Sequence, residues 1–339
     1  MENANQACAA SADDNFKYNP PVILITFILG LAGNVTALWI FCFHVKSRRP
    51  NVVYSLNLMI ADTLLMCCLP FRAHYFINGK DWIFGDVPCR LNVFMISLNR
   101  VGSVIFLMAI AVDRYFKVVR PFHKANKISP RCAAMLAGAL WVVAVGICLH
   151  LLVERHDFHQ INIARTYCEP FNITNPHGAT AIWTDTVFIC FTLILPVSVL
   201  VFSSSCIIWK LRQMETEMRR KYKRTVQLVI AVVVVFVICF LPTNIAVVAV
   251  LVTKQKPTDC KKYITAVNIF YNTLFVTYLN SVIDPVIYYF SNSAFKDALK
   301  KALVHLNLRS CKSATSQNNE QGESQGQTLD QQTASVTPF

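Results

Sequence analysis

Charged side chains are scarce in this sequence: Asp, Glu, Lys and Arg make up only 15% of its 339 residues, against about 25% in soluble domains. A period-two alternation of apolar and polar residues is also missing, which excludes a membrane β-barrel. Instead, 54% of the residues are hydrophobic, and runs of about 20 apolar residues recur along most of the chain. The sequence therefore predicts an all-α membrane protein with several transmembrane helices.

Other absences narrow the class of protein. The first 20 residues lack a basic start followed by an apolar run, so no cleavable signal peptide is expected. There is no internal repeat of the transporter type and no His, Cys or Glu cluster with metal-ligand spacing, which argues against a transporter and an enzyme. The net charge of +13 does not indicate nucleic acid, because the basic residues lie in short segments between apolar runs.

We predict seven transmembrane helices, over residues 21–44, 51–76, 88–118, 131–153, 181–210, 225–252 and 263–290. Basic residues concentrate after the first, third and fifth spans, which places these segments inside the cell and the N-terminus outside. Residues 1–20 are then the extracellular N-terminus, and residues 21–290 are the membrane domain. Residues 291–310 predict a short amphipathic helix on the inner membrane surface. The polar residues 311–339 predict a disordered cytoplasmic tail.

The predicted span 88–118 is unusual because it carries two arginines, Arg100 and Arg114. They lie roughly 21 Å apart along a helix and share one face with Cys89 and Ser103. Charges in a membrane helix almost always face the protein interior or a water-filled cavity. Two partners for Arg100 remain open: a ligand carboxylate bound bidentately, or a structural ion pair with Asp185.

Short motifs occur in order along the spans: Gly33 and Asn34, residues 58–62, residues 113–115, Trp141, Pro196, residues 239–242 and residues 284–288. Together they resemble the rhodopsin-like class of G-protein-coupled receptors over about residues 20–310. Four further segments look like the hydroxycarboxylic acid receptors, with the oxoeicosanoid receptor as a near relative: residues 37–44, 84–90, 98–100 and 277–281. The resemblance implies a receptor in the plasma membrane that is not an enzyme.

The resemblance also implies a ligand site. Arg100 would anchor the carboxylate of a small acid. Arg72 would direct a second cation into the same cavity; the alternative is an arginine that snorkels to the membrane interface. Tyr278 would offer a hydroxyl to the ligand or serve as a packed core tyrosine. One residue departs from the pattern, because Val247 stands where some family members carry another arginine on span six.

Four cysteines lie in polar segments that we place on one side of the membrane: Cys8, Cys89, Cys168 and Cys260. An oxidising compartment makes them disulfide candidates. In the receptor class that the chain resembles, cysteines at the places of Cys89 and Cys168 are bonded to each other. Cys8 and Cys260, which are left over on the same side, would then tie the N-terminus to the third outer loop.

Deeper in the predicted bundle, five residues resemble the sodium pocket of the receptor class: Asn34, Asp62, Ser103, Asn280 and Asp284. Oxygen ligands and buried carboxylates suit a hard cation. The alternatives are a proton shared between the two acids and a hydrogen-bonded polar core without an ion. Apart from such an allosteric sodium ion, no cofactor is expected.

The resemblance places an activation switch at the inner end, with eight residues: Asp113, Arg114, Tyr115, Phe240, Pro242, Asp284, Pro285 and Tyr288. Arg114 would pair with Asp113 until activation and then contact the inserted helix of a G protein. Phe240 stands where many receptors have tryptophan, above a kink expected at Pro242. Ser204 stands where a second tyrosine of the switch is common.

Several modification sites and partners are expected. Asn172 begins a glycosylation sequon in a segment that we place outside. Cys311 is a palmitoylation candidate that would add an anchor to membrane lipids; the alternative is an unmodified cysteine. Phosphorylated Ser and Thr residues in the tail would engage receptor kinases and arrestin.

The sequence thus predicts a receptor for small carboxylic acids that lowers cAMP through an inhibitory heterotrimeric G protein. The same arginine could hold the carboxylate of a long-chain oxidised fatty acid, such as an oxo- or hydroxyeicosanoid, and the length of the pocket decides between the two. An organic-acid transporter is the reading from a different class, and the missing repeat disfavours it.

Overall fold

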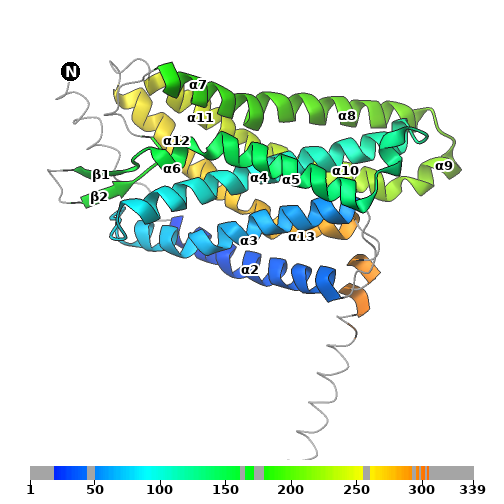
Figure 1. Cartoon of the computed structure of the whole chain (residues 1–339), viewed down its shortest axis with the longest axis horizontal. Coiled ribbons are helices and arrows are strands. Elements are labelled where there is room, and N and C mark those ends of the chain that lie inside the picture. Colours follow the sequence, from blue (N-terminus) through cyan, green and yellow to red (C-terminus); the bar gives the residue numbers. More distant parts are fainter. Residues whose placement is uncertain are drawn as a thin grey trace, which may run out of the picture.

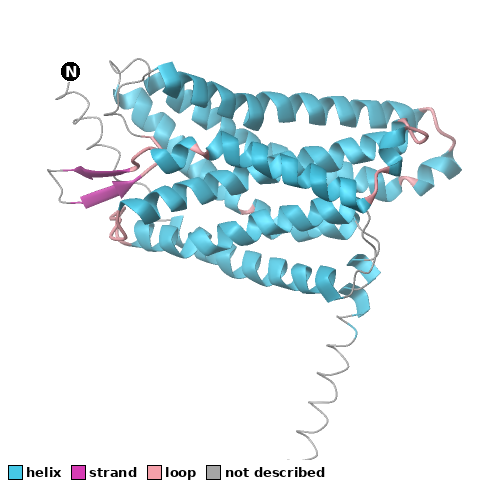
Figure 2. Cartoon of the chain, in the orientation of Figure 1, coloured by secondary structure: helices cyan, strands magenta, loops and turns pink. Residues whose placement is uncertain are grey.

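The computed structural model describes residues 19–43, 50–160, 165–171, 179–254, 260–291, 295–297, 299–301 and 304. Over these residues the chain forms a bundle of long, roughly aligned helices with one short β-hairpin at one end (Figures 1 and 2). We call this the hairpin end. We call the other end, where the helix carrying Arg114 finishes, the opposite end.

The longer helices follow in chain order: α2 (Asn19–Phe43), α3 (Pro50–Ile77), α4 (Asp86–Val119), α5 (Pro130–Cys148), α7 (Ala179–Ile189), α8 (Leu195–Arg212), α10 (Lys223–Val235), α11 (Leu241–Lys254), α12 (Cys260–Tyr278) and α13 (Asn280–Ser291). The shorter helical elements are η1 (Lys124–Lys127), α6 (His150–Val153), η2 (Cys190–Ile194), α9 (Thr216–Lys221) and η3 (Phe236–Phe240). The hairpin pairs β1 (Asp157–Gln160) with β2 (Arg165–Cys168) in antiparallel register.

The predicted all-α seven-helix bundle is confirmed. Within the described ranges, six helical stretches are long and apolar enough to cross a membrane: Pro20–Phe43, Val52–Ile77, Asp86–Val119, Pro130–Cys148, Trp183–Arg212 and Lys223–Lys254. They match the first six predicted spans. The seventh, predicted as one helix over 263–290, is instead α12 followed by α13. The backbone tightens between them, because the Val282 N–H donates to the carbonyl of Leu279, three residues back, at 3.0 Å.

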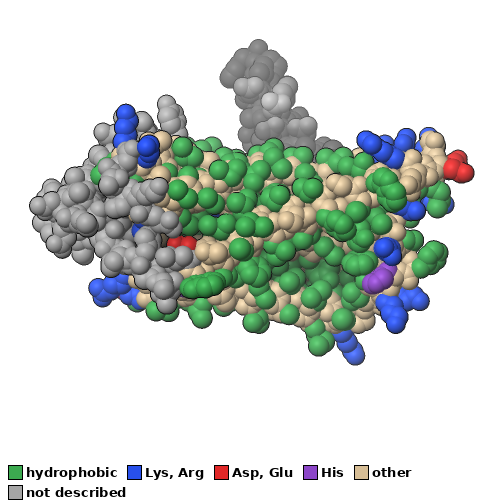
Figure 3. All heavy atoms as spheres, turned by 90° about the horizontal axis from the view of Figure 1, so that it is seen from above, with side chains coloured by type: hydrophobic (Ala, Val, Ile, Leu, Met, Phe, Trp, Pro, Cys, Tyr) green, Lys and Arg blue, Asp and Glu red, His purple; other side chains and the backbone are tan. Residues whose placement is uncertain are grey.

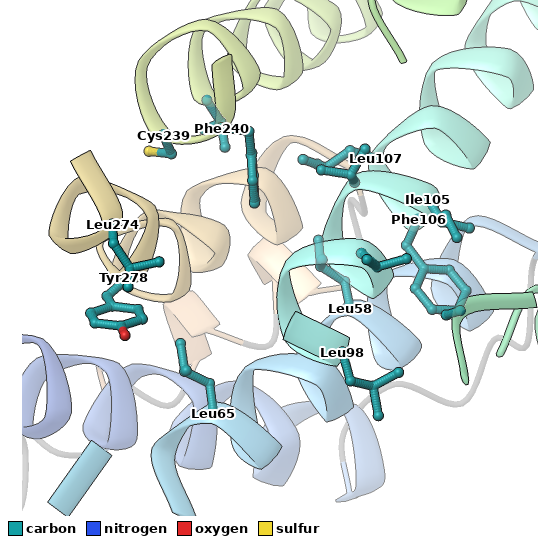
Figure 4. Close-up of a cluster of buried hydrophobic side chains, with 14 of the residues drawn as sticks. Leu58, Leu65, Leu98, Ile105, Phe106, Leu107, Cys239, Phe240, Leu274 and Tyr278 are labelled. Atoms are coloured by element: carbon teal, nitrogen blue, oxygen red, sulfur yellow. The ribbon is translucent and has the colours of Figure 1, made fainter. Parts of the chain in front are cut away.

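Helix α4 occupies the centre of the bundle. Of its most apolar window 78% is buried, against 28–56% in the other five stretches, and it packs against α3, α5, α8 and α10. Figure 4 shows core side chains from α3, α4, η3 and α12, among them the fully buried Phe240. The face seen in Figure 3 carries apolar side chains along its length and charged ones mainly near its ends, as expected for a protein that spans lipid.

Prolines explain the two wide turns, η2 and η3, which are π-helical. Pro196 has no N–H for the carbonyl of Thr192, and its ring crowds that carbonyl, so the helix widens ahead of it. The side-chain amide of Asn244 donates to the freed Thr192 carbonyl at 3.0 Å. Pro242 follows η3 in the same way, so the distortion expected at this proline takes the form of a π-helical turn.

The hairpin is fastened to the loop between α3 and α4. The backbone N–H of Trp82 donates to the carbonyl of Thr166 at 2.7 Å, and the N–H of Thr166 donates to Asp81 Oδ1 at 3.0 Å. The predicted disulfide between Cys89 and Cys168 is present, with a Cα–Cα distance of 5.8 Å. These bonds hold the end of β2 over the start of α4.

Candidate ligand-binding site

A cavity of about 110 Å³ lies at the hairpin end, between α3, α4, α6, α7, α11 and α12. Pro170 and Phe171, which follow β2, line it as well. Both arginines predicted for the ligand site, Arg72 and Arg100, reach this cavity. The consecutive helices α3 and α4 therefore bring the two cations to one cavity.

Arg100 is 5% exposed, and its guanidinium carbon lies 4.7 Å from the centre of the Phe188 ring. Its Nε is buried without a hydrogen-bond partner. Among the described residues, no carboxylate forms an ion pair with Arg100. Asp185 lines the same cavity but interacts electrostatically with Lys254. The structural ion pair considered as an alternative is therefore not formed, and the guanidinium can accept an incoming carboxylate.

Arg72 lines the cavity, and its role as a second cation for the ligand stays a prediction. It is 2% exposed, so it does not snorkel to the interface. One terminal nitrogen donates to the carbonyl of Cys168 at 2.7 Å, and the guanidinium lies over the rings of Tyr75 and Phe76 at 5.1 and 5.6 Å. Tyr278 is buried near Arg72, outside the cavity lining. Its hydroxyl makes no hydrogen bond of normal geometry.

The cavity has two charged lining residues that the sequence did not indicate, Lys254 and Glu154. Glu154 and Asp185 both interact electrostatically with Lys254. The helical spacing of Lys254 from Val247 could have identified it as a residue of the cavity. It lies seven residues beyond Val247, which is two turns along the same face of α11, and Val247 itself lines the cavity. Helix α11 thus carries valine where some family members have an arginine, but it has a lysine two turns nearer the hairpin end.

Asp62 is the centre of a buried polar cluster between α2, α3 and α13. Its Oδ1 accepts a hydrogen bond from Ser281 at 2.7 Å, and its Oδ2 accepts one from Tyr288 at 3.1 Å. Because Pro285 has no N–H, the Ser281 carbonyl is left free, and Asn34 donates to it at 2.9 Å. Tyr288, predicted as part of the activation switch, thus contacts the residues predicted for the sodium site. Ser281 is a further member of this cluster that the sequence did not indicate.

This cluster contains oxygens that could hold a cation. Three buried oxygens of the cluster have no hydrogen-bond partner: Asn34 Oδ1, Asn280 Oδ1 and Asp284 Oδ1. Ser103 Oγ, on α4, is also buried without a partner. Asn280 donates to the other oxygen of Asp284 at 2.9 Å, and Asp284 interacts with Asp62. Unpartnered oxygens next to two carboxylates are a suitable donor set for a hard cation such as sodium.

At the opposite end, the predicted pair of Asp113 and Arg114 is present, with an N–O distance of 3.1 Å. Lys117, one turn further along α4, shares the same carboxylate oxygen at 2.7 Å. The sequence did not indicate this second cation. Tyr115 packs against Phe202 with ring centres 5.5 Å apart.

Some predicted features lie outside the described residues: Cys8, Asn172, Cys311 and the tail 311–339. Cys260 is disulfide-bonded, and its pairing with Cys8 stays a prediction.

The predicted surface helix 291–310 is described in part. There Phe295 is 2% exposed and stacks on Phe41 at 5.1 Å, which docks this segment against α2.

Comparison with known proteins identifies the family. The family described as 7 transmembrane receptor (rhodopsin family) matches residues 33–288. The chain belongs to this family. The receptor is 41% identical over 298 residues to hydroxycarboxylic acid receptor 2 of Homo sapiens, which covers 87% of this chain and 80% of that protein. It is 37% identical over 298 residues to hydroxycarboxylic acid receptor 1 of Homo sapiens (88% and 83% covered). It is 34% identical over 275 residues to oxoeicosanoid receptor 1 of Homo sapiens (81% and 69% covered).

Family membership has direct consequences for the receptor. It is a multi-pass protein of the plasma membrane, and its partners are a ligand and a G protein. The family is not enzymatic. The cavity and the polar cluster are therefore to be understood as parts of a receptor.

Proposed function

We propose that this receptor binds small carboxylic acids, that Arg100 anchors the ligand carboxylate, and that binding lowers cAMP through an inhibitory G protein. One observation carries the proposal: a buried guanidinium lines a cavity without a carboxylate partner in the described part of the chain. The names of the relatives at 41% and 37% identity refer to hydroxycarboxylic acids, which supports the same ligand class.

The cavity suits a carboxylate chemically. The planar fork of Arg100 can donate two parallel hydrogen bonds to the two carboxylate oxygens. The Phe188 ring under the guanidinium keeps water from that side, and the lower local dielectric strengthens the ion pair. Val247 and Leu274, which also line the cavity, offer apolar contacts to a short carbon chain.

The size of the cavity favours a small acid over a long one. Its volume of about 110 Å³ is well below the roughly 300–1,000 Å³ of pockets that enclose drug-sized ligands. A long-chain oxidised fatty acid, which the oxoeicosanoid receptor relative suggests, needs a larger space. That ligand class is therefore the second candidate.

The orientation and the switch belong to the same proposal. The hairpin end faces outside, as the oxidised cysteines favour, and the basic opposite end faces the cytoplasm. On activation Arg114 leaves Asp113 and contacts the G protein. A sodium ion held by the cluster around Asp62 stabilises the inactive state. Receptor kinases and arrestin then act on the tail.

The test is inhibition of cAMP in cells by straight-chain monocarboxylates of rising length. We expect the potency to peak at a short acid. Arg100→Ala should lower it by about 100-fold or more, because unpairing a buried charge costs about 3–5 kcal/mol. Arg90→Ala is the matched control. Arg90 lies on the same helix, is paired with Asp86 and does not line the cavity, so its removal should leave the potency nearly unchanged.

Each other outcome points elsewhere. An undiminished response in Arg100→Ala refutes the carboxylate anchor. A potency that keeps rising to long chains favours an oxidised fatty acid as ligand. Uptake of labelled acid that depends on Arg100 favours transport over signalling.

A further inference from the structure

The turn after α3 holds a buried lysine in an unfavourable backbone conformation. Gly79 and Lys80 have φ angles of 66° and 65°, and a positive φ is uncommon for a residue with a Cβ. The N–H of Lys80 donates to the carbonyl of Tyr75 at 2.9 Å, which closes the turn. The side chain of Lys80 points inward, because the residue is only 5% exposed. The fold thus tolerates backbone strain at a residue that keeps an ammonium group inside.

The ammonium is paired with a buried carboxylate. Lys80 Nζ lies 3.6 Å from Glu169 Oε1 and 5.2 Å from the centre of the Tyr271 ring. Glu169 is 9% exposed, and the same oxygen accepts a hydrogen bond from Tyr75 at 3.2 Å. A buried ion pair contributes little net stability, because desolvation offsets its attraction. A contribution to stability therefore does not explain why Lys80 and Glu169 are buried as a pair, and a role in function is favoured.

Glu169 lies directly behind the ligand cavity. It follows Cys168, whose carbonyl accepts a hydrogen bond from Arg72 at 2.7 Å, and it precedes Pro170, which lines the cavity. Tyr75 connects the two charges: its ring lies 5.1 Å from the Arg72 guanidinium, and its hydroxyl donates to Glu169. A change in charge at Glu169 therefore changes the electrostatic potential at the Arg72 guanidinium.

We propose that Glu169 sets the charge preference of the ligand site and makes the receptor selective for acids with one carboxylate. Its negative charge offsets much of the positive charge of Arg72, so that Arg100 is left as the strong anchor. Lys80 limits this effect, because it shares the carboxylate. Glu169 is a positioning residue, since it acts through Arg72 and lies outside the cavity lining. This inference rests on the proposed function.

The test compares two acids on one receptor. The probes are the most potent straight-chain monocarboxylate and the dicarboxylate with the same number of carbons. The dicarboxylate is measured as an agonist and as a competitor of the monocarboxylate. The quantity of interest is the ratio of their potencies, which does not depend on how much receptor reaches the cell surface.

Two variants should shift this ratio in opposite directions. Glu169→Gln still offers an oxygen to Tyr75 but removes the negative charge, so the potency of the dicarboxylate should rise relative to that of the monocarboxylate. Lys80→Met leaves the full charge of Glu169 to act on Arg72, so the relative potency of the dicarboxylate should fall. We expect roughly tenfold in each direction, the effect of one unit charge at about 10 Å in a partly buried site. A purely structural role would instead weaken both acids alike in both variants.

Asp86→Asn is the matched control, because it removes a carboxylate at the same end of the bundle that pairs with Arg90 outside the cavity lining. It should leave the ratio unchanged. If Asp86→Asn moves the ratio as far as Glu169→Gln does, or if both test variants move it the same way, the inference is refuted and the proposed function stands. If Glu169→Gln does not reach the surface, the sign of the Lys80→Met shift decides. A wild-type receptor that answers no monocarboxylate refutes the proposed function itself.

Discussion

Replacing Arg100 by methionine should make the ligand-free receptor more stable while it abolishes the response to acids. The guanidinium is 5% exposed and has no carboxylate partner among the described residues, and its Nε has no hydrogen-bond partner. Methionine is of similar length and can pack on the Phe188 ring. Replacing buried ion pairs by apolar side chains of similar volume stabilises proteins by up to about 1–4 kcal/mol, and Arg100 lacks the attraction that such a pair provides. Because Arg100 already has Phe188 as a neighbour, we expect the lower half of that range.

Arg72 supplies the matched contrast, since it is equally buried and lines the same cavity. Arg72→Met leaves the carbonyl of Cys168 without its donor, and a buried group that loses its partner costs about 1–3 kcal/mol. The two substitutions should therefore change stability with opposite signs. Thermal unfolding of the purified receptor in lipid nanodiscs, without acid, measures both.

Addition of acid completes this experiment. A saturating monocarboxylate should raise the unfolding temperature of the wild type, because the ligand binds only the folded receptor. It should have no effect on Arg100→Met. If Arg100→Met lowers the unfolding temperature of the ligand-free receptor as Arg72→Met does, Arg100 has a structural partner and the reasoning that assigns it to a ligand is wrong.

Three further predictions concern other sites. Asp113→Asn should raise ligand-independent nucleotide exchange on the G protein several-fold, and Lys117→Met should not, because only the first change removes the partner of Arg114. Sodium should weaken agonist binding to the wild type relative to potassium; an equal effect on Asp62→Asn would contradict the cation site. Burial lowers the pKa of His156, which lies outside the membrane spans. Acidification below about pH 6.5 therefore protonates His156 in the unfolded chain before it does so in the folded receptor, which lowers stability. The unfolding temperature of His156→Gln should depend less on pH than that of the wild type.

The number, order and approximate limits of the helices could be predicted, because lipid imposes one requirement on every span. A span must be long, apolar and helical, so local composition is sufficient to find it. The same local rule identified Arg100, since an arginine inside an apolar run is conspicuous wherever the helix packs. Its lack of an obvious partner in the other spans predicted a cavity at this helix.

Other features depended on which side chains meet. Arg72 binds the carbonyl of Cys168 rather than the membrane interface, and Tyr288 donates to Asp62. The seventh span divides between α12 and α13. The two side-chain contacts join residues far apart in the chain, and neither partner carries a local signal of the other.

Lys80 and Glu169 show the same limit. In the sequence they are polar residues in loops, and nothing near either one indicates burial. Their pairing arises because the turn after α3 and the end of β2 are brought against the bundle by the hairpin and its disulfide. Composition alone was thus sufficient to indicate a membrane bundle with a cation inside. Which charges compensate one another around the cavity depends on distances, and these exist only once the helices and the hairpin are packed.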